Sequence, residues 1–158
     1  MESFDSKEKR RALFKSYDLN ANGYMSLAEL DRMVKYDKRF EPFRSSKAIL
    51  RAYKRADDPK KKGHVGWINR AEFRDFLHYL PLYQNLWEHF SKADENYDGR
   101  VSLLELKKAE KDLQLEPGEV EKVFKEIDSN KGGYILFDEW CDYYIEKELA
   151  KLPPEEDD

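Results

Sequence analysis

The sequence predicts an all-α protein built from four helix–loop–helix repeats in two pairs. Three observations indicate this fold class. Three twelve-residue stretches, starting at Asp18, Asp94 and Asp128, share one pattern of oxygen-bearing side chains, glycine and glutamate. Apolar residues recur at helical spacing on both sides of each stretch. The first two stretches start 76 residues apart and the last two 34 apart, so a further copy is expected between the first two.

The helices are predicted from apolar stripes that flank every loop, including the expected extra copy. Residues three or four positions apart lie on one helix face, and such a face usually packs into a core. We expect these aromatic and aliphatic residues to be core rather than a binding groove. The stripes are Leu13, Phe14 and Tyr17; Leu30, Met33 and Val34; Ile49, Ala52 and Tyr53; Phe73, Phe76 and Leu77; Leu86, Trp87 and Phe90; Leu106, Ala109 and Leu113; Val120, Val123, Phe124 and Ile127; and Trp140, Tyr143 and Tyr144.

Proline residues suggest where helices begin and end. Pro81 is expected to end the helix that follows the second repeat, which excludes a long exposed central helix and predicts contact between the two halves. Segment 40–43 separates the first two repeats, and Pro117 is expected at the start of a later helix. These features predict an N-terminal pair over 1–80, a C-terminal pair over 81–150 and an acidic, disordered tail over 151–158.

The three matching stretches have the layout of a calcium-binding loop: loop 1 (18–29), loop 3 (94–105) and loop 4 (128–139). Calcium prefers about six to eight oxygen ligands, supplied here by positions one, three and five, the position-seven carbonyl and a bidentate glutamate at twelve. Glycine at position six permits the positive φ of the turn. The predicted metal ligands are Asp18, Asn20, Asn22, Tyr24 and Glu29; Asp94, Asn96, Asp98, Arg100 and Glu105; and Asp128, Asn130, Tyr134 and Glu139.

A fourth copy, loop 2 (61–72), keeps the frame of the pattern and loses its chemistry. Gly66 and Glu72 occupy positions six and twelve, but positions one, three and five carry no side-chain oxygen. We therefore expect no ion there. Position eight is apolar in all four loops, which predicts a short antiparallel pairing between the two loops of each pair. These position-eight residues are Met25, Ile68, Val101 and Ile135.

On these loops the chain resembles the EF-hand proteins of the calmodulin superfamily over nearly its whole length. It most resembles the protozoan flagellar calcium-binding proteins (calflagins), which also have widely spaced first and second hands and a degraded second loop. The resemblance implies a cytoplasmic calcium-binding protein, with a flagellar or membrane-associated location as the alternative. Calflagins are acylated near the N-terminus. Here Glu2 stands where N-myristoylation needs glycine, so no such anchor is predicted.

We expect two or three bound Ca²⁺ ions, with Mg²⁺ as a competitor. Loop 3 offers three carboxylates at ligand positions, whereas loops 1 and 4 offer two each. Loop 4 also has Gly132 at position five and Leu136 at position nine, where oxygen ligands are usual. Because affinity depends partly on ligand charge, the predicted order is loop 3, loop 1, then loop 4.

Charge is divided unevenly along the chain. Residues 1–80 hold 19 Lys and Arg against 12 Asp and Glu, a net charge of +7, whereas residues 81–158 hold 10 against 21, a net charge of −11. A basic cluster near loop 2 fits an anionic membrane surface, an acidic partner, a solvated face, or docking onto the acidic half of this same chain. Nucleic acid is not expected because the net charge is −4. The cluster consists of Lys47, Arg51, Lys54, Arg55, Lys60, Lys61 and Lys62.

Two functions fit these features. A sensor would open on binding calcium and engage a protein target, whereas a buffer would bind calcium with little opening. Only three methionines are present, which disfavours a promiscuous target groove. The single cysteine, Cys141, predicts no internal disulfide framework and is expected to pack on the last helix. The scattered histidines do not suggest zinc, no catalytic arrangement is recognisable, and we expect a non-enzymatic monomer.

Overall fold

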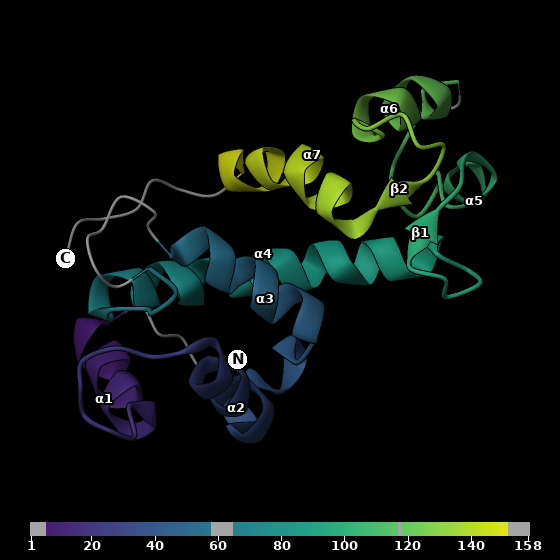
Figure 1. Ribbon diagram of the computed structural model, residues 1–158. Helices are drawn as coiled ribbons and strands as arrows, with labels where there is room; N and C mark the ends of the chain where they lie inside the picture. The colour runs from purple at the N-terminus through teal and green to yellow at the C-terminus, as the bar shows by residue number, and fades with distance from the viewer. Residues whose placement is uncertain (1–5, 58–64, 117, 152–158) are drawn as a thin grey trace. The chain divides into compact units, whose positions relative to one another are not determined.

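The computed structural model describes residues 6–57, 65–116 and 118–151. It is largely helical, as predicted, and it divides into two compact units with the boundary between Gln84 and Asn85 (Figure 1). Of the sequence predictions, those on Lys60–Lys62, on Pro117 and on the tail beyond residue 151 lie outside the described residues. Within the described part of the chain, no helix is both long enough and apolar enough to cross a membrane.

The first unit contains two helix–loop–helix repeats. Its elements are α1 (Lys7–Tyr17), α2 (Leu27–Tyr36), the 3₁₀ helix η1 (Lys38–Phe43), α3 (Ser46–Ala56) and the first part of α4 (Arg70–Ala93). Serine hydroxyls at Ser6, Ser26 and Ser45 accept backbone N–H groups at the starts of α1, α2 and α3. These caps satisfy donors that a helix leaves unpaired and explain why the helices begin there. The expected break at 40–43 is the 3₁₀ helix η1.

The core of the first unit is formed largely by the predicted stripes, although Tyr17, Tyr53 and Leu77 are only half-buried. Phe14 of α1 and Phe73 of α4 contact edge to face, with ring centroids 5.3 Å apart. Both side chains are buried, and such a pair contributes about 0.5–1.5 kcal/mol beyond its buried area. Other fully buried members are Leu13, Met25, Leu30, Met33, Val34, Phe40, Ala48, Ile49, Ala52, Ile68 and Phe76.

The second unit contains the end of α4 and five further elements. These are β1 (Arg100–Val101), α5 (Leu103–Lys108), α6 (Val120–Ile127), β2 (Ile135–Leu136) and α7 (Phe137–Ala150). Phe90 of α4 lies against Phe137 and Trp140 of α7, with ring centroids 5.5 Å and 5.7 Å away. Cys141 is also fully buried on α7, as predicted. The aromatic stripes of this unit are therefore largely core.

The loops pair as the apolar position-eight residues predict. In the second unit, β1 and β2 are antiparallel, with Val101 opposite Ile135. In the first unit, Met25 and Ile68 form an antiparallel bridge through two backbone hydrogen bonds of 2.8 Å. All four side chains are fully buried. Loop 2 thus supplies half of a loop pair.

The predicted end of a helix at Pro81 is wrong. Helix α4 continues through Pro81 and runs without interruption from Arg70 to Ala93 (Figure 1). Proline removes one backbone donor and is costly inside a helix, about 3 kcal/mol. Here Leu80 and Tyr83, on either side of it, are buried at 1% and 2% exposure, and this packing holds the helical path. The expected contact between the two halves stays a prediction.

Candidate metal centres

Loop 1 begins where α1 ends. Asp18 is the C-cap of α1, and its Oδ2 accepts the backbone N–H of Gly23 at 2.8 Å. Gly23 has a φ of 82°, the left-handed conformation that the turn requires of position six. Amide oxygens of Asn20 and Asn22 accept the N–H groups two residues further on. These bonds hold the loop in a tight turn.

One atom of loop 1 is unsatisfied by the protein. Asp18 Oδ1 is buried and has no hydrogen-bond partner. The residue as a whole is only 9% exposed, so little water reaches its carboxylate. A buried carboxylate oxygen without a donor costs free energy unless a cation compensates it. The donor set of loop 1, made of carboxylate and amide oxygens, is the type that calcium prefers. The residues of this loop therefore fit the ion that the sequence predicts.

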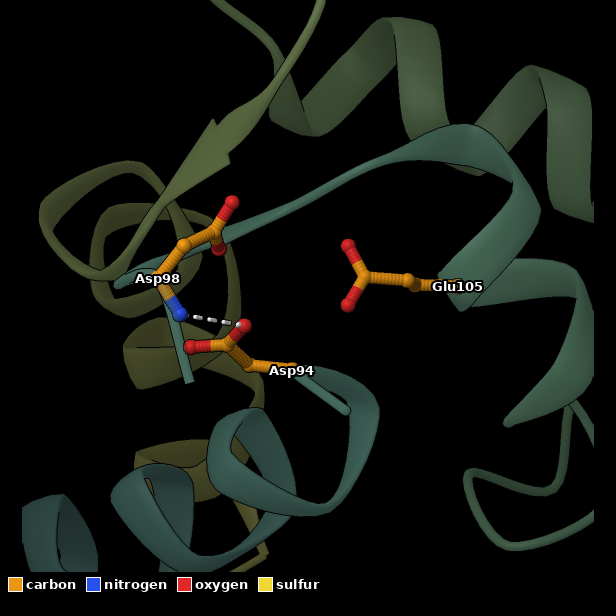
Figure 2. Close-up of side chains that lie close together, drawn as sticks. All are labelled: Asp94, Asp98 and Glu105. Atoms are coloured by element: carbon orange, nitrogen blue, oxygen red, sulfur yellow. Dashed lines mark hydrogen bonds between the residues drawn. The ribbon is translucent and has the colours of Figure 1, made fainter. Parts of the chain in front are cut away.

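Loop 3 gathers three carboxylates around one space. One carboxylate oxygen from each of Asp94, Asp98 and Glu105 lies within 4.8 Å of the other two (Figure 2). Asp94 Oδ2 accepts the N–H of Gly99 at 2.9 Å, and Asp94 Oδ1 accepts the N–H of Asp98 at 3.3 Å. These bonds aim the Asp94 carboxylate into the loop. Among the described residues, the acidic side chains converge in this way only in loop 3.

Two aspartates of loop 3, Asp94 and Asp98, have shifted pKa values. Burial raises the pKa of Asp94, and the neighbouring Asp98 carboxylate raises it further. For Asp98, desolvation acts in the same upward direction, but hydrogen bonds from the Arg100 side chain and backbone lower its pKa overall. The Arg100 Nε donates to Asp98 Oδ2 at 3.1 Å. A cation between these carboxylates would relieve their mutual repulsion.

Loop 4 repeats the design with fewer oxygens. Asp128 Oδ2 accepts the N–H of Gly133 at 3.0 Å, and Asp128 Oδ1 accepts the N–H of Gly132 at 3.2 Å. Asn130 Oδ1 also accepts the N–H of Gly132, at 2.9 Å. Position five supplies only this backbone donor and no side-chain oxygen. The loop keeps the frame of loops 1 and 3, but it has a smaller ligand set.

The position-twelve glutamate joins the two ends of each loop. Glu105 Oε1 accepts the N–H of Ser102 at 3.0 Å, and Glu105 Oε2 accepts the N–H of Glu95, also at 3.0 Å. Glu29 and Glu139 make corresponding pairs of bonds in loops 1 and 4. In loops 1 and 3 this glutamate also completes a capping box with a serine at position nine.

Comparison with known proteins agrees with this geometry. A family model described as the FCaBP EF-hand domain matches residues 2–80, and one described as an EF-hand domain pair matches residues 83–145. The flagellar calcium-binding protein of Trypanosoma cruzi is 30% identical over 148 residues, which cover 87% of this chain and 69% of that protein. The chain belongs to the EF-hand flagellar calcium-binding proteins.

Other relatives of this EF-hand protein differ more in length. The flagellar calcium-binding protein TB-44A of Trypanosoma brucei brucei is 28% identical, and the match covers 92% of this chain but 38% of that protein. The mitochondrial adenyl nucleotide antiporter SLC25A24-A of Xenopus laevis is 25% identical over 91% of this chain and 29% of its own. Among solved structures, a programmed cell death 6 homologue from Leishmania major has a TM-score of 0.41 at 20% identity, covering 91% and 74% of the two chains.

The second EF-hand contains a residue that the twelve-residue pattern missed. Asp57 is the C-cap of α3, and its Oδ2 accepts the N–H of Gly66 at 2.8 Å. In loops 1, 3 and 4 the aspartate at position one makes this same bond to the glycine at position six. Asp57 therefore takes the place that the sequence assigned to Lys61. In the sequence Asp57 directly follows a helix, as position one does in the other loops. However, four more residues separate it from the position-six glycine than in those loops, so the twelve-residue pattern did not include it.

Further hydrogen bonds within the protein hold the second EF-hand loop in its conformation, and none of them involves an ion. The Tyr53 hydroxyl donates to the carbonyl of Gly66, so both backbone groups of Gly66 are held by side chains from the end of α3. The Asn69 N–H donates to Glu72 Oε1 at 3.0 Å, and Asn69 Oδ1 accepts the Glu72 N–H at 2.9 Å. This is the capping box of loops 1 and 3 with asparagine in place of serine.

The three position-seven residues differ in what their side chains do. Tyr24 is half-buried, Tyr134 is 41% exposed, and the Arg100 side chain turns to Asp98. The sequence predicts that position seven binds the ion through its backbone carbonyl, which leaves these side chains free to vary. The assignment of the individual ligand residues stays a prediction, supported by the frame described above.

Proposed function

We propose that this chain is a calcium sensor, in which calcium binding changes the EF-hands and exposes apolar surface to a protein partner. The observation that carries the proposal is the position-twelve glutamate. Its backbone lies in the first turn of the helix that leaves the loop, and its carboxylate is bonded to the beginning of the loop. A change in what this carboxylate contacts is therefore passed directly to a helix.

Loop 1 illustrates this coupling. Glu29 Oε1 accepts the N–H of Ser26, whereas Glu29 Oε2 lies 3.4 Å from the N–H of Leu19, at the outer limit of a hydrogen bond. A cation that took both carboxylate oxygens would displace these donors and move the start of α2. Since α2 buries Leu30, Met33 and Val34, its movement would alter the core of the first unit.

A titration separates the sensor from the buffer. Calcium uptake is followed by calorimetry, and exposure of apolar surface is followed in parallel by the fluorescence of a hydrophobic dye. For a sensor, the dye signal should rise and saturate with calcium uptake, and Glu105→Gln should reduce both. Calcium uptake without any dye response would identify a buffer. Magnesium, tested alone and in competition, shows whether the smaller ion occupies the same loops.

Association with an anionic membrane is a second candidate, favoured by the exposed cations of α3. Lys47, Lys54 and Arg55 are exposed there, whereas Arg51 is half-buried with its guanidinium 5.7 Å from the Tyr83 ring centroid. Each well-placed cation contributes about 1 kcal/mol near an anionic surface, and salt screens the effect.

Vesicle co-sedimentation tests the membrane candidate. Phosphatidylserine vesicles should bind the protein at low salt and lose it at high salt, while phosphatidylcholine vesicles should bind little. Replacing Lys60, Lys61 and Lys62 with glutamine should weaken binding more than replacing Lys107, Lys108 and Lys111. Equal sedimentation with both lipids at low salt would remove this candidate.

From the names of the relatives, we also propose a flagellar location.

A further inference from the structure

The first unit has a hollow between the N-terminal parts of α1 and α4. Its volume is about 390 Å³, within the range of pockets that hold small ligands or anchoring side chains, about 300–1,000 Å³. Its lining comes from the two helices alone and includes no residue of loops 1, 3 or 4. The lining residues are Lys7, Arg10, Arg11, Phe14, Arg70, Ala71, Phe73, Arg74 and Asp75.

The aromatic residues of this hollow lie behind its cations. Phe14 and Phe73 belong to its lining, but each is only 1% exposed and packs into the core of the unit. The guanidinium of Arg70 lies 5.8 Å from the Phe14 ring centroid, a cation–π contact. The accessible wall of the hollow is therefore formed mainly by exposed cationic side chains.

The edge of the hollow is strongly basic. Five cations line it against one carboxylate, Asp75, for a formal charge of +4. Lys7 and Arg11 are four residues apart on α1, as Arg70 and Arg74 are on α4. Like charges at this spacing destabilise a helix. These two pairs of like charges therefore destabilise α1 and α4. The concave wall of the hollow concentrates their positive potential.

We infer that this hollow is a docking site for an acidic segment of a partner protein. Carboxylates of that segment face Lys7, Arg11 and Arg70, which are exposed, and its apolar side chains pack on the aliphatic stems of these cations. The inference deepens the proposed sensor function, on which it rests, by giving the chemical character of the partner. A peptide fits better than a bilayer surface because these cations line a concave space rather than a flat face.

The test uses the full-length protein and a defined probe. The probe is a fluorescein-labelled helical peptide with leucine at positions i, i+3, i+4 and i+7 and glutamate elsewhere, and the matched peptide has glutamine in place of glutamate. Anisotropy should report binding of the glutamate peptide that weakens as salt rises. The double variant Arg11→Gln/Arg70→Gln should weaken that binding about ten-fold. The control Lys122→Gln/Lys125→Gln changes the charge equally on exposed positions of α6 and should have little effect.

Several results would overturn the inference. Equal losses in both double variants would show a general charge effect, and equal binding of the two peptides would show apolar binding without selection for acid. Sedimentation with phosphatidylserine vesicles that depends on Arg11 and Arg70, with no peptide binding, would assign the hollow to a membrane. Because Arg70 also contacts Phe14, Arg11→Gln alone, with an unchanged melting temperature, provides a second variant.

The two proposals can fail separately. If the dye responds to calcium but the glutamate peptide does not bind, the sensor stands and the docking site is rejected. If the peptide binds equally with calcium and with chelator while the dye does not respond, the docking site stands and the sensor is rejected.

Discussion

Arg100 lies over the ring of Tyr134, with its guanidinium carbon 4.2 Å from the ring centroid. The two residues occupy position seven of loops 3 and 4; Arg100 is the first residue of β1, and Tyr134 directly precedes β2. The Nε of the same guanidinium donates to Asp98, a predicted ligand. The Arg100 side chain therefore contacts both a predicted ligand of loop 3 and an aromatic ring of loop 4.

Arg100→Met should raise the calcium affinity of loop 3 about three- to five-fold, because it removes a cation beside Asp98 and keeps an apolar contact with Tyr134. Calorimetry at low salt measures the change, which should shrink as salt rises. Lys107→Met, at an exposed cation of the same unit, is the control. Unchanged or weaker binding in Arg100→Met would contradict the role assigned to this ion pair.

The position-twelve glutamates should differ in their effect on ion binding. Glu105→Gln should nearly abolish binding at loop 3, because one carboxylate supplies two of the predicted ligand oxygens. Glu72→Gln should leave the number of bound ions unchanged, since the amide oxygen can still accept the Asn69 N–H. Native mass spectrometry counts the ions. Loss of an ion in Glu72→Gln would instead indicate a site that involves Asp57.

Loop 4 should gain affinity from one added carboxylate. Gly132→Asp supplies the missing side-chain oxygen at position five and should strengthen calcium binding at loop 4 about ten-fold. A Cβ at Gly132 would lie 3.0 Å from Asn130 Oδ1, the end of a side chain that can shift. Gly132→Ala isolates this steric effect and should bind no better than the parent chain. Calorimetry of the three proteins decides whether position five limits this loop.

Tyr53→Phe should weaken the frame of the second EF-hand without removing a bound ion. It deletes the hydrogen bond to the Gly66 carbonyl, which corresponds to about 1 kcal/mol of unfolding free energy. Since loop 2 pairs with loop 1 through Ile68 and Met25, calcium affinity at Asp18 should fall about two- to five-fold. Urea unfolding and calorimetry measure the two effects. Tyr36→Phe, at a residue that is 78% exposed, should change neither.

The stability of the first unit should depend on acid through Asp37. Hydrogen bonds from the Arg39 side chain lower the pKa of Asp37 to about 2, against opposing burial, and Tyr17 donates to the same carboxylate at 2.9 Å. A lowered native pKa stabilises the fold above the ordinary value of 3.8, and this contribution is lost as pH falls toward 2.

Melting temperatures of the parent chain and Asp37→Asn check this dependence. In calcium-free buffer the variant should melt several degrees lower at pH 6, and the difference should shrink between about pH 4 and pH 2. Asp31→Asn, which removes a more exposed ion pair with Lys35, should show a small difference throughout. A constant difference for Asp37→Asn would show that its charge is not the cause.

Features that few residues can satisfy were predictable from the sequence. The turn in loops 1, 3 and 4 requires positive φ, and Gly23, Gly99 and Gly133 adopt values of 82–86°. The position-eight residues had to be buried because they are apolar in every loop, and they form the predicted pairings. In both cases a local requirement leaves almost no alternative.

Features that depend on packing or on chain length were not predictable in this way. Asp57 was missed because a fixed loop length of twelve places Lys61 at position one, although the Asp57–Gly66 hydrogen bond spans a longer connection. The path through Pro81 was missed because local propensity favours a helix end there, while burial of Leu80 and Tyr83 favours continuation. Tertiary contacts decided the second case.

The carboxylates of Glu29, Glu105 and Glu139 already accept backbone donors from both ends of their loops. Ion capture through these glutamates would therefore be an exchange of partners, in which the carboxylate gives up N–H donors in favour of the metal. The calcium affinity would then be the difference between two sets of bonds. Substitutions at the donor positions, which never touch the ion, can consequently tune the calcium threshold of this chain.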